Sequence, residues 1–125
     1  MQTVGVVGSG TMATGIIEVF AKGGYEVRFV ARGTEKVEAV QKELVRSLEK
    51  QVQRGKLEES ARDEVLGRVT GSTSLDDLAD RDLIVEAVVE SLPVKEALFS
   101  NLGELAKPGA VLATTTSSSS KGPIG

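Results

Sequence analysis

Residues 3–17 read TVGVVGSGTMATGII, and this stretch decides the fold. Its first five residues are mostly apolar and β-branched, which predicts a short buried β-strand. Gly8-Ser9-Gly10 follows at once, and apolar residues then recur at the helical spacing of positions 12, 16, 17 and 20. The predicted order is therefore strand, tight glycine turn and helix, as in a parallel α/β unit.

The pattern continues outward from this unit. Gly23-Gly24 ends the helix, and residues 25–30 predict a second strand. Thr34 is a candidate N-cap for a long helix, and Gly55 separates that helix from a shorter one at 57–66. The apolar stripe of the long helix consists of Val37, Val40, Leu44, Leu48 and Val52. Together these helices form a helical hairpin inserted after the second strand.

The remaining segments complete a sheet. They predict a weak strand at 69–70, a turn of helix at 76–79, a buried strand at 82–89, a helix through Leu105 with Pro93 in its first turn, and a last strand at 110–114. The fold class is α/β, with a doubly wound, mostly parallel sheet of the Rossmann type and five strands at most. We expect one domain over residues 1–118 and a loop or tail over 119–125.

Composition excludes several functions. The 125 residues carry 15 basic and 18 acidic side chains and a net charge of −3, so there is no basic footprint for nucleic acid. No apolar run approaches the ~20 residues that span a bilayer, and no leader precedes the first strand, so we expect a cytoplasmic protein without membrane contact. The chain has no Cys and no His, which removes thiolate and imidazole ligands, and we predict no metal site.

The glycine turn carries the chemistry. In the pattern Gly8-x-Gly10-x-x-Ala13, Gly8 permits a tight turn, Gly10 lets a pyrophosphate approach the backbone, and Ala13 permits close helix packing. The N–H groups at the start of the helix favour the phosphate charge. The predicted dinucleotide site therefore includes Gly8, Ser9, Gly10, Thr11, Met12 and Ala13.

The end of the second strand bears on the choice of cofactor. NAD-binding domains usually place an acidic residue there to bind the adenosine ribose, but this chain has Ala31 and Arg32. A guanidinium can pair with a 2′-phosphate, and the missing carboxylate removes the repulsion against one. The residues therefore favour NADP over NAD, with an exposed surface arginine as the alternative explanation.

The chain resembles the N-terminal nucleotide-binding domain of the 3-hydroxyacyl-CoA dehydrogenase family over residues 3–118. The motifs that carry the resemblance are the glycine turn with Met12, Gly55-Lys56-Leu57, the run IVEAVVE at 84–90, and Lys95 with Leu98-Phe99. The resemblance implies reversible hydride transfer between a 3-hydroxyacyl thioester and NAD(P), in fatty acid metabolism. It favours NAD, and it implies a thioester of CoA or an acyl carrier protein as substrate and a homodimer in the full-length protein.

Three further site residues follow from the resemblance. Glu90 and Lys95 match residues that line the nicotinamide side of the cofactor site, and Ser117 matches a serine at the substrate hydroxyl. Their alternatives are a strand-end carboxylate, a solvated cation and part of a polar tail, respectively. Glu86 is a second candidate, because strand alternation puts it on the face of Glu90 near the carboxyl end of its strand.

The family's general base is a histidine oriented by a glutamate, and this sequence has no histidine. The resemblance places that residue, and a C-terminal helical domain, beyond Gly125. We therefore expect a cofactor-binding half that is inactive alone. Two alternatives stay open at this point: an NADP domain like those of β-hydroxyacid and 6-phosphogluconate dehydrogenases, and a non-catalytic nucleotide-binding module.

Overall fold

A computed structural model describes residues 3–88 and 92–115. A parallel five-stranded sheet in the order β3-β2-β1-β4-β5 forms its centre. The strands are β1 (Thr3–Val7), β2 (Glu26–Val30), β3 (Val69–Ser72), β4 (Leu83–Glu86) and β5 (Val111–Thr114). The chain thus adds strands on one side of β1 and then crosses to its other side, which confirms the doubly wound Rossmann-type sheet.

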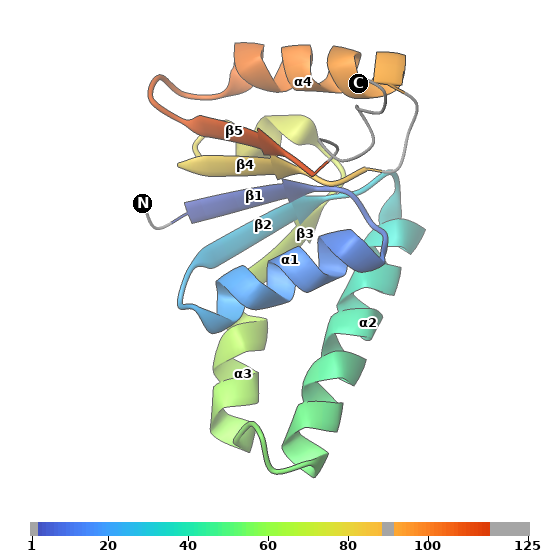
Figure 1. Ribbon diagram of the computed structural model, residues 1–125, viewed down its shortest axis with the longest axis vertical. Helices are drawn as coiled ribbons and strands as arrows, with labels where there is room; N and C mark the ends of the chain where they lie inside the picture. The colour runs from blue at the N-terminus through green and yellow to red at the C-terminus, as the bar shows by residue number, and fades with distance from the viewer. Residues whose placement is uncertain (1–2, 89–91, 116–125) are drawn as a thin grey trace.

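Helices cover both faces of this sheet (Figure 1). The helices are α1 (Thr11–Lys22), α2 (Thr34–Gln53), α3 (Glu59–Gly67), the short 3-10 helix η1 (Leu75–Leu78) and α4 (Leu92–Leu105). α1 and the α2–α3 hairpin share one core cluster with β1 and β2, whereas η1 and α4 share the other with β4. The inserted hairpin extends away from the sheet at the bottom of Figure 1.

The apolar stripe of α2 docks the hairpin. Val40, Leu44 and Leu48 are at most 1% exposed, and they pack against the cluster that contains Ile17 and Phe29. Burying each such aliphatic side chain contributes about 2 kcal/mol. The helical periodicity read from the sequence therefore identifies the buried side of α2 correctly.

Several predicted boundaries move by one or two residues, and two differences have a physical cause. Thr34 is not the N-cap of α2: Gly33 occupies that position with a φ of 97°, a conformation that glycine adopts without strain. The strand predicted at 82–89 ends at Glu86, because the Glu86 carboxylate accepts the backbone N–H of Val88 at 2.7 Å. That side-chain bond takes the place of a sheet hydrogen bond beyond the strand end.

A buried arginine lies at the amino-terminal ends of the strands. Arg81 is 2% exposed and donates to both carboxylate oxygens of Asp80, at 3.0 and 3.2 Å, and to Glu26 at 3.2 Å. Burial by itself would lower the pKa of Arg81, but the bonds to these carboxylates outweigh burial and raise it. Arg81 also lies against Gly5, where an added Cβ would come within 3.0 Å of its Cγ. This ion cluster is structural, because it lies at the opposite end of the strands from the glycine turn.

Within the described ranges, no helix is long and apolar enough to cross a bilayer. The same residues contain no group of three or more acidic side chains arranged to hold a metal ion.

Candidate functional site

The carboxyl ends of the strands meet in one row across the sheet. The row pairs Ser72 with Val30, Val30 with Val7, Val7 with Glu86, and Glu86 with Thr114. The strand order reverses between β1 and β4, and in open α/β sheets ligands bind in the crevice beyond the strand ends at such a switch point. The glycine turn leaves β1 at this place.

Gly8 is a glycine for reasons internal to the fold. Its φ is 142°, and an added Cβ would lie 2.7 Å from the carbonyl oxygen of Ala87 and 3.3 Å from the Cβ of Ala13. The Gly8 N–H also donates to the carbonyl of Val30 at 3.0 Å. The roles predicted for Gly8 as the tight turn and for Ala13 as the close helix contact are therefore consistent with this packing.

Gly10 is different, since no protein atom lies within 4 Å of an added Cβ. Gly10 is the N-cap of α1 in extended conformation, no side chain caps the helix, and no acidic residue lies in its first turn. Thr14 directs its hydroxyl to the Gly10 carbonyl at 3.1 Å, behind the turn. The helix start thus offers backbone N–H groups and open space to an anion, which fits a pyrophosphate.

A cavity of about 440 Å³ begins at this turn and is mostly apolar; we call it the turn cavity. It is lined by Val7, Gly8, Ser9, Gly10, Val30, Ala31, Arg32, Lys36, Thr73, Leu75, Ala87, Val88, Val94 and Leu98. Its volume lies in the range of small-molecule and cofactor sites. The apolar walls come from the strand ends and α4, and the polar groups come from the glycine turn and the segments after β2 and β3.

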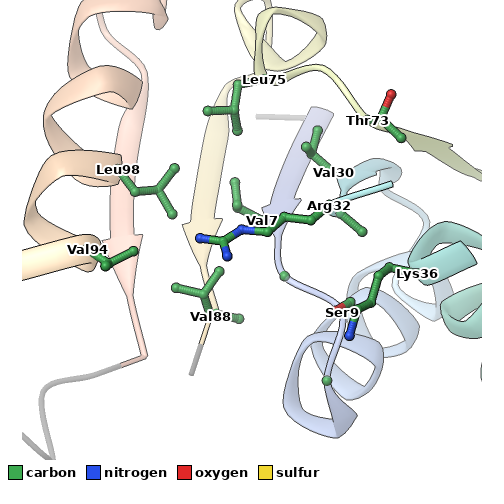
Figure 2. Close-up of a pocket in the computed structure, with 14 residues that line it drawn as sticks. Val7, Ser9, Val30, Arg32, Lys36, Thr73, Leu75, Val88, Val94 and Leu98 are labelled. Carbon is green, nitrogen blue, oxygen red and sulfur yellow. The ribbon is translucent and has the colours of Figure 1, made fainter. Parts of the chain in front are cut away.

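Two cations reach the turn cavity from the segment after β2. In Figure 2, Arg32 extends from the end of β2 across the cavity, and Lys36, in the first turn of α2, points toward Ser9. Ala31, at 5% exposure, supplies no polar group to the wall. The site therefore has positive charge where an NAD-binding domain usually has an acid.

A second cavity, of about 370 Å³, lies at the ends of β4 and β5; we call it the α4 cavity. Its lining consists of Glu86, Leu92, Lys95, Glu96, Phe99, Ser100 and Thr114. The first two turns of α4 contribute to both cavities, because Val94 and Leu98 line the turn cavity while Lys95 and Phe99 line the other.

Glu86 is the polar centre of the α4 cavity wall. It is 1% exposed, and it accepts the Thr114 hydroxyl at 2.5 Å and the Val88 N–H at 2.7 Å. The Nζ atom of Lys95 lies 3.6 Å from the same oxygen that Val88 contacts. Lys95, whose side chain is 12% exposed, is thus held at the sheet rather than pointing into solvent.

Six of the eleven site residues predicted from sequence line one of the two cavities. Gly8, Ser9, Gly10, Ala31 and Arg32 line the turn cavity, and Lys95 lines the α4 cavity. Thr11 and Met12 lie in the first turn of α1 outside both linings, and Met12 is 57% exposed. Glu90 and Ser117 lie outside the described residues.

Sequence reasoning missed Lys36 and gave Glu86 only second place. The spacing of Lys36 four residues after Arg32, one helical turn into α2, was an available signal. For Glu86 the available signal was a lone acid in an apolar strand, since a buried carboxylate needs partners.

Comparisons with known proteins agree with this geometry. Residues 3–124 match the family model described as 3-hydroxyacyl-CoA dehydrogenase, NAD binding domain. The chain is 45% identical to a 3-hydroxybutyryl-CoA dehydrogenase of Mycobacterium tuberculosis, over 94% of this chain and 42% of that protein. The chain thus spans about two fifths of the length of that relative.

Solved structures give the same result. A crystal structure of FadB2 from M. tuberculosis superimposes with a TM-score of 0.91 at 45% identity, over 94% of this chain and 41% of that one. A 3-hydroxybutyryl-CoA dehydrogenase from Escherichia coli gives 0.89 at 40% identity, over 93% and 25%. The structural similarity therefore extends over more than nine tenths of this chain.

Proposed function

The chain belongs to the family of 3-hydroxyacyl-CoA dehydrogenase NAD-binding domains, and we propose that it is the cofactor-binding half of an oxidoreductase acting on a 3-hydroxyacyl thioester. The observation that carries this proposal is the open approach to Gly10 above the uncapped start of α1, at the switch point of the sheet. A nicotinamide dinucleotide fits that arrangement, with its pyrophosphate at the turn.

Each of the two cavities is assigned one half of the dinucleotide. The adenosine ribose of a dinucleotide lies beside the end of the second strand, so the turn cavity takes the adenosine half near Ala31 and Arg32. The nicotinamide half then extends over the ends of β4 and β5, where Lys95 lies. In this arrangement Ser9 and Gly10 hold phosphate oxygens, Thr11 and Met12 begin the helix behind them, and Glu90 and Lys95 border the nicotinamide.

We further propose that the chain prefers NADP, although the matched family model describes an NAD-binding domain. Arg32 and Lys36 supply two cations beside the adenosine half, and no carboxylate among the cavity residues opposes a 2′-phosphate. Calorimetric titration of the chain with NADPH and NADH tests both levels of the proposal. Tighter binding of NADPH is expected, equal or weaker binding overturns the preference, and binding of neither overturns the cofactor role.

We propose that catalysis also needs a base that these residues do not supply. When bound, the nicotinamide would accept or donate the hydride, and a base must accept the proton of the substrate hydroxyl. None of the 125 residues is a histidine, so we propose that this base lies outside these residues, with Ser117 contacting the substrate hydroxyl. Substrate class and assembly are proposed in the same way: an acyl thioester of CoA or of an acyl carrier protein, and a homodimer of the whole protein. Oxidation of 3-hydroxybutyryl-CoA by this chain alone would contradict the assignment of the base.

A further inference from the structure

Glu86 is an acid in a position that otherwise suits an apolar residue. It lies in the last row of the sheet between Val7 and Thr114, faces α4, and is 1% exposed. A carboxylate in such a place is costly unless other groups satisfy it. At the carboxyl edge of the sheet, between the glycine turn and the α4 cavity, its charge can have a role that an aliphatic side chain could not fill.

The partners of Glu86 come from three different segments. Thr114 is the last residue of β5, Val88 lies in the connection after β4, and Lys95 lies in the first turn of α4. One carboxylate thus ties the end of the neighbouring strand, the loop that leaves its own strand, and the helix above. This fixes the place of α4 relative to the edge of the sheet at which ligands bind.

Lys95 is the partner whose position depends most on the charge of Glu86. A cation in the first turn of a helix is repelled by the positive end of the helix dipole. The side chain of Lys95 is nevertheless only 12% exposed, with its Nζ atom 3.6 Å from Glu86. The Glu86 charge offsets that repulsion and holds the ammonium group at the wall of the α4 cavity.

We propose that Glu86 is a positioning residue for the nicotinamide half of the cofactor site and acts through Lys95. This rests on the proposed function, which places that half over β4 and β5. Glu86 and Lys95 both line the cavity, but the 1% exposure of Glu86 leaves it almost no surface for a ligand, whereas the side chain of Lys95 is 12% exposed. Glu86 therefore determines where the cation lies, and Lys95 makes the contact.

The test compares ligands that do or do not reach Lys95. The parent chain, Glu86→Gln, Lys95→Met and the double variant are titrated by calorimetry with NAD⁺ and ADP, and with NADP⁺ and 2′,5′-ADP. ADP lacks the nicotinamide riboside of NAD⁺, and 2′,5′-ADP lacks the nicotinamide riboside and one pyrophosphate phosphate of NADP⁺. Glu86→Gln is expected to weaken dinucleotide binding about tenfold, as for the loss of one charge-assisted contact, and to leave ADP and 2′,5′-ADP binding unchanged. The double variant is expected to bind no more weakly than Lys95→Met, because both changes remove one interaction.

Glu18→Gln is the matched control. Glu18 also accepts a hydroxyl, from Ser47 at 2.6 Å, and an amide N–H, from Gln51 at 2.7 Å, and it pairs with Lys22 at 3.8 Å. It joins α1 to α2, away from both cavities. This variant is expected to change the free energy of unfolding without changing the affinity for any of the four ligands.

Three results would overturn the inference: unchanged dinucleotide binding by Glu86→Gln, equal weakening of the dinucleotides and the two shorter nucleotides, or additive losses in the double variant. A parent chain that binds none of the four ligands overturns the proposed function instead. If circular dichroism shows that Glu86→Gln is unfolded, Thr114→Val removes one bond to the carboxylate and keeps its charge. That variant is expected to weaken dinucleotide binding alone, by less than Lys95→Met, and unchanged binding would overturn the inference.

Discussion

The position that a Cβ on Gly8 would occupy lies 2.7 Å from the carbonyl oxygen of Ala87. The turn after β1 thus packs closely against the residue that follows β4, and these two strands flank the switch point. Gly8 is therefore needed by the protein itself, whereas the space at Gly10 is open.

Gly8→Ala and Gly10→Ala should separate stability from binding. Gly8→Ala is expected to lower the free energy of unfolding by about 3 kcal/mol, from the strained φ and the clash with Ala87. Gly10→Ala should cost less than about 1 kcal/mol, the range for a change of N-cap, but should block the approach of a pyrophosphate. Urea unfolding and calorimetry measure the two effects. Full cofactor affinity in Gly10→Ala would contradict the role assigned to that glycine.

Arg32→Gln tests the origin of the expected NADP preference. Losing one charged partner of the 2′-phosphate should weaken NADPH binding about tenfold or more, and NADH binding should change little. Lys36→Gln should act in the same direction. Arg46→Gln is the control, because Arg46 is also on α2 but pairs with Glu43 on the surface. Equal losses of affinity for NADPH and NADH would show that these cations do not bind the 2′-phosphate.

The Asp80–Arg81 pair should make the free energy of unfolding depend on pH in the acid range. The hydrogen bonds from Arg81 hold the pKa of Asp80 below its ordinary value of 3.8. The folded state thus binds this proton more weakly than the unfolded chain, so the stabilisation is present above 3.8 and is lost as the pH falls through the lowered pKa. The Asp80 side chain is 66% exposed, so the contribution is at most about 1 kcal/mol. Urea unfolding of the parent and Asp80→Asn should differ at neutral pH and converge in acid; a constant difference would contradict this linkage.

Two substitutions on α2 test how the hairpin docks. Leu48 is fully buried in the stripe, and Val45, one turn earlier on the flank of the same helix, is 41% exposed. Leu48→Ala is expected to lower the free energy of unfolding by about 2–5 kcal/mol, and Val45→Ala by no more than about 0.5 kcal/mol. Both are measured by urea unfolding. Equal effects of the two changes would mean that the stripe does not dock the hairpin in solution.

The parts of the fold that could be predicted from sequence are those with local causes. The glycine turn, the stripe of α2 and the break at Gly55 follow from conformational limits and helical spacing within a few residues. The sequence predicts an end of β4 that is too late, because an apolar run does not show that the Glu86 side chain will accept the backbone N–H of Val88.

The candidate site divides in the same way. Gly8, Gly10 and Arg32 could be chosen from sequence, since each lies at a fixed offset from the first two strands. Lys36 and the partners of Glu86 are much harder to predict from the sequence. Thr114 lies 28 residues beyond Glu86, and only the pairing of β4 with β5 brings the two together.

By itself the sequence determined the strand–turn–helix order and the inserted hairpin, and it predicts a dinucleotide site at the glycine turn, because those features depend on neighbouring residues and on periodicity. The tertiary structure alone decided which distant groups share the carboxyl edge of the sheet. It brought Lys36 and Ser9 to the wall of one cavity, and it placed Lys95 and Thr114 each against Glu86. The physical reason is that strand pairing and helix docking, rather than distance along the chain, determine which charges meet.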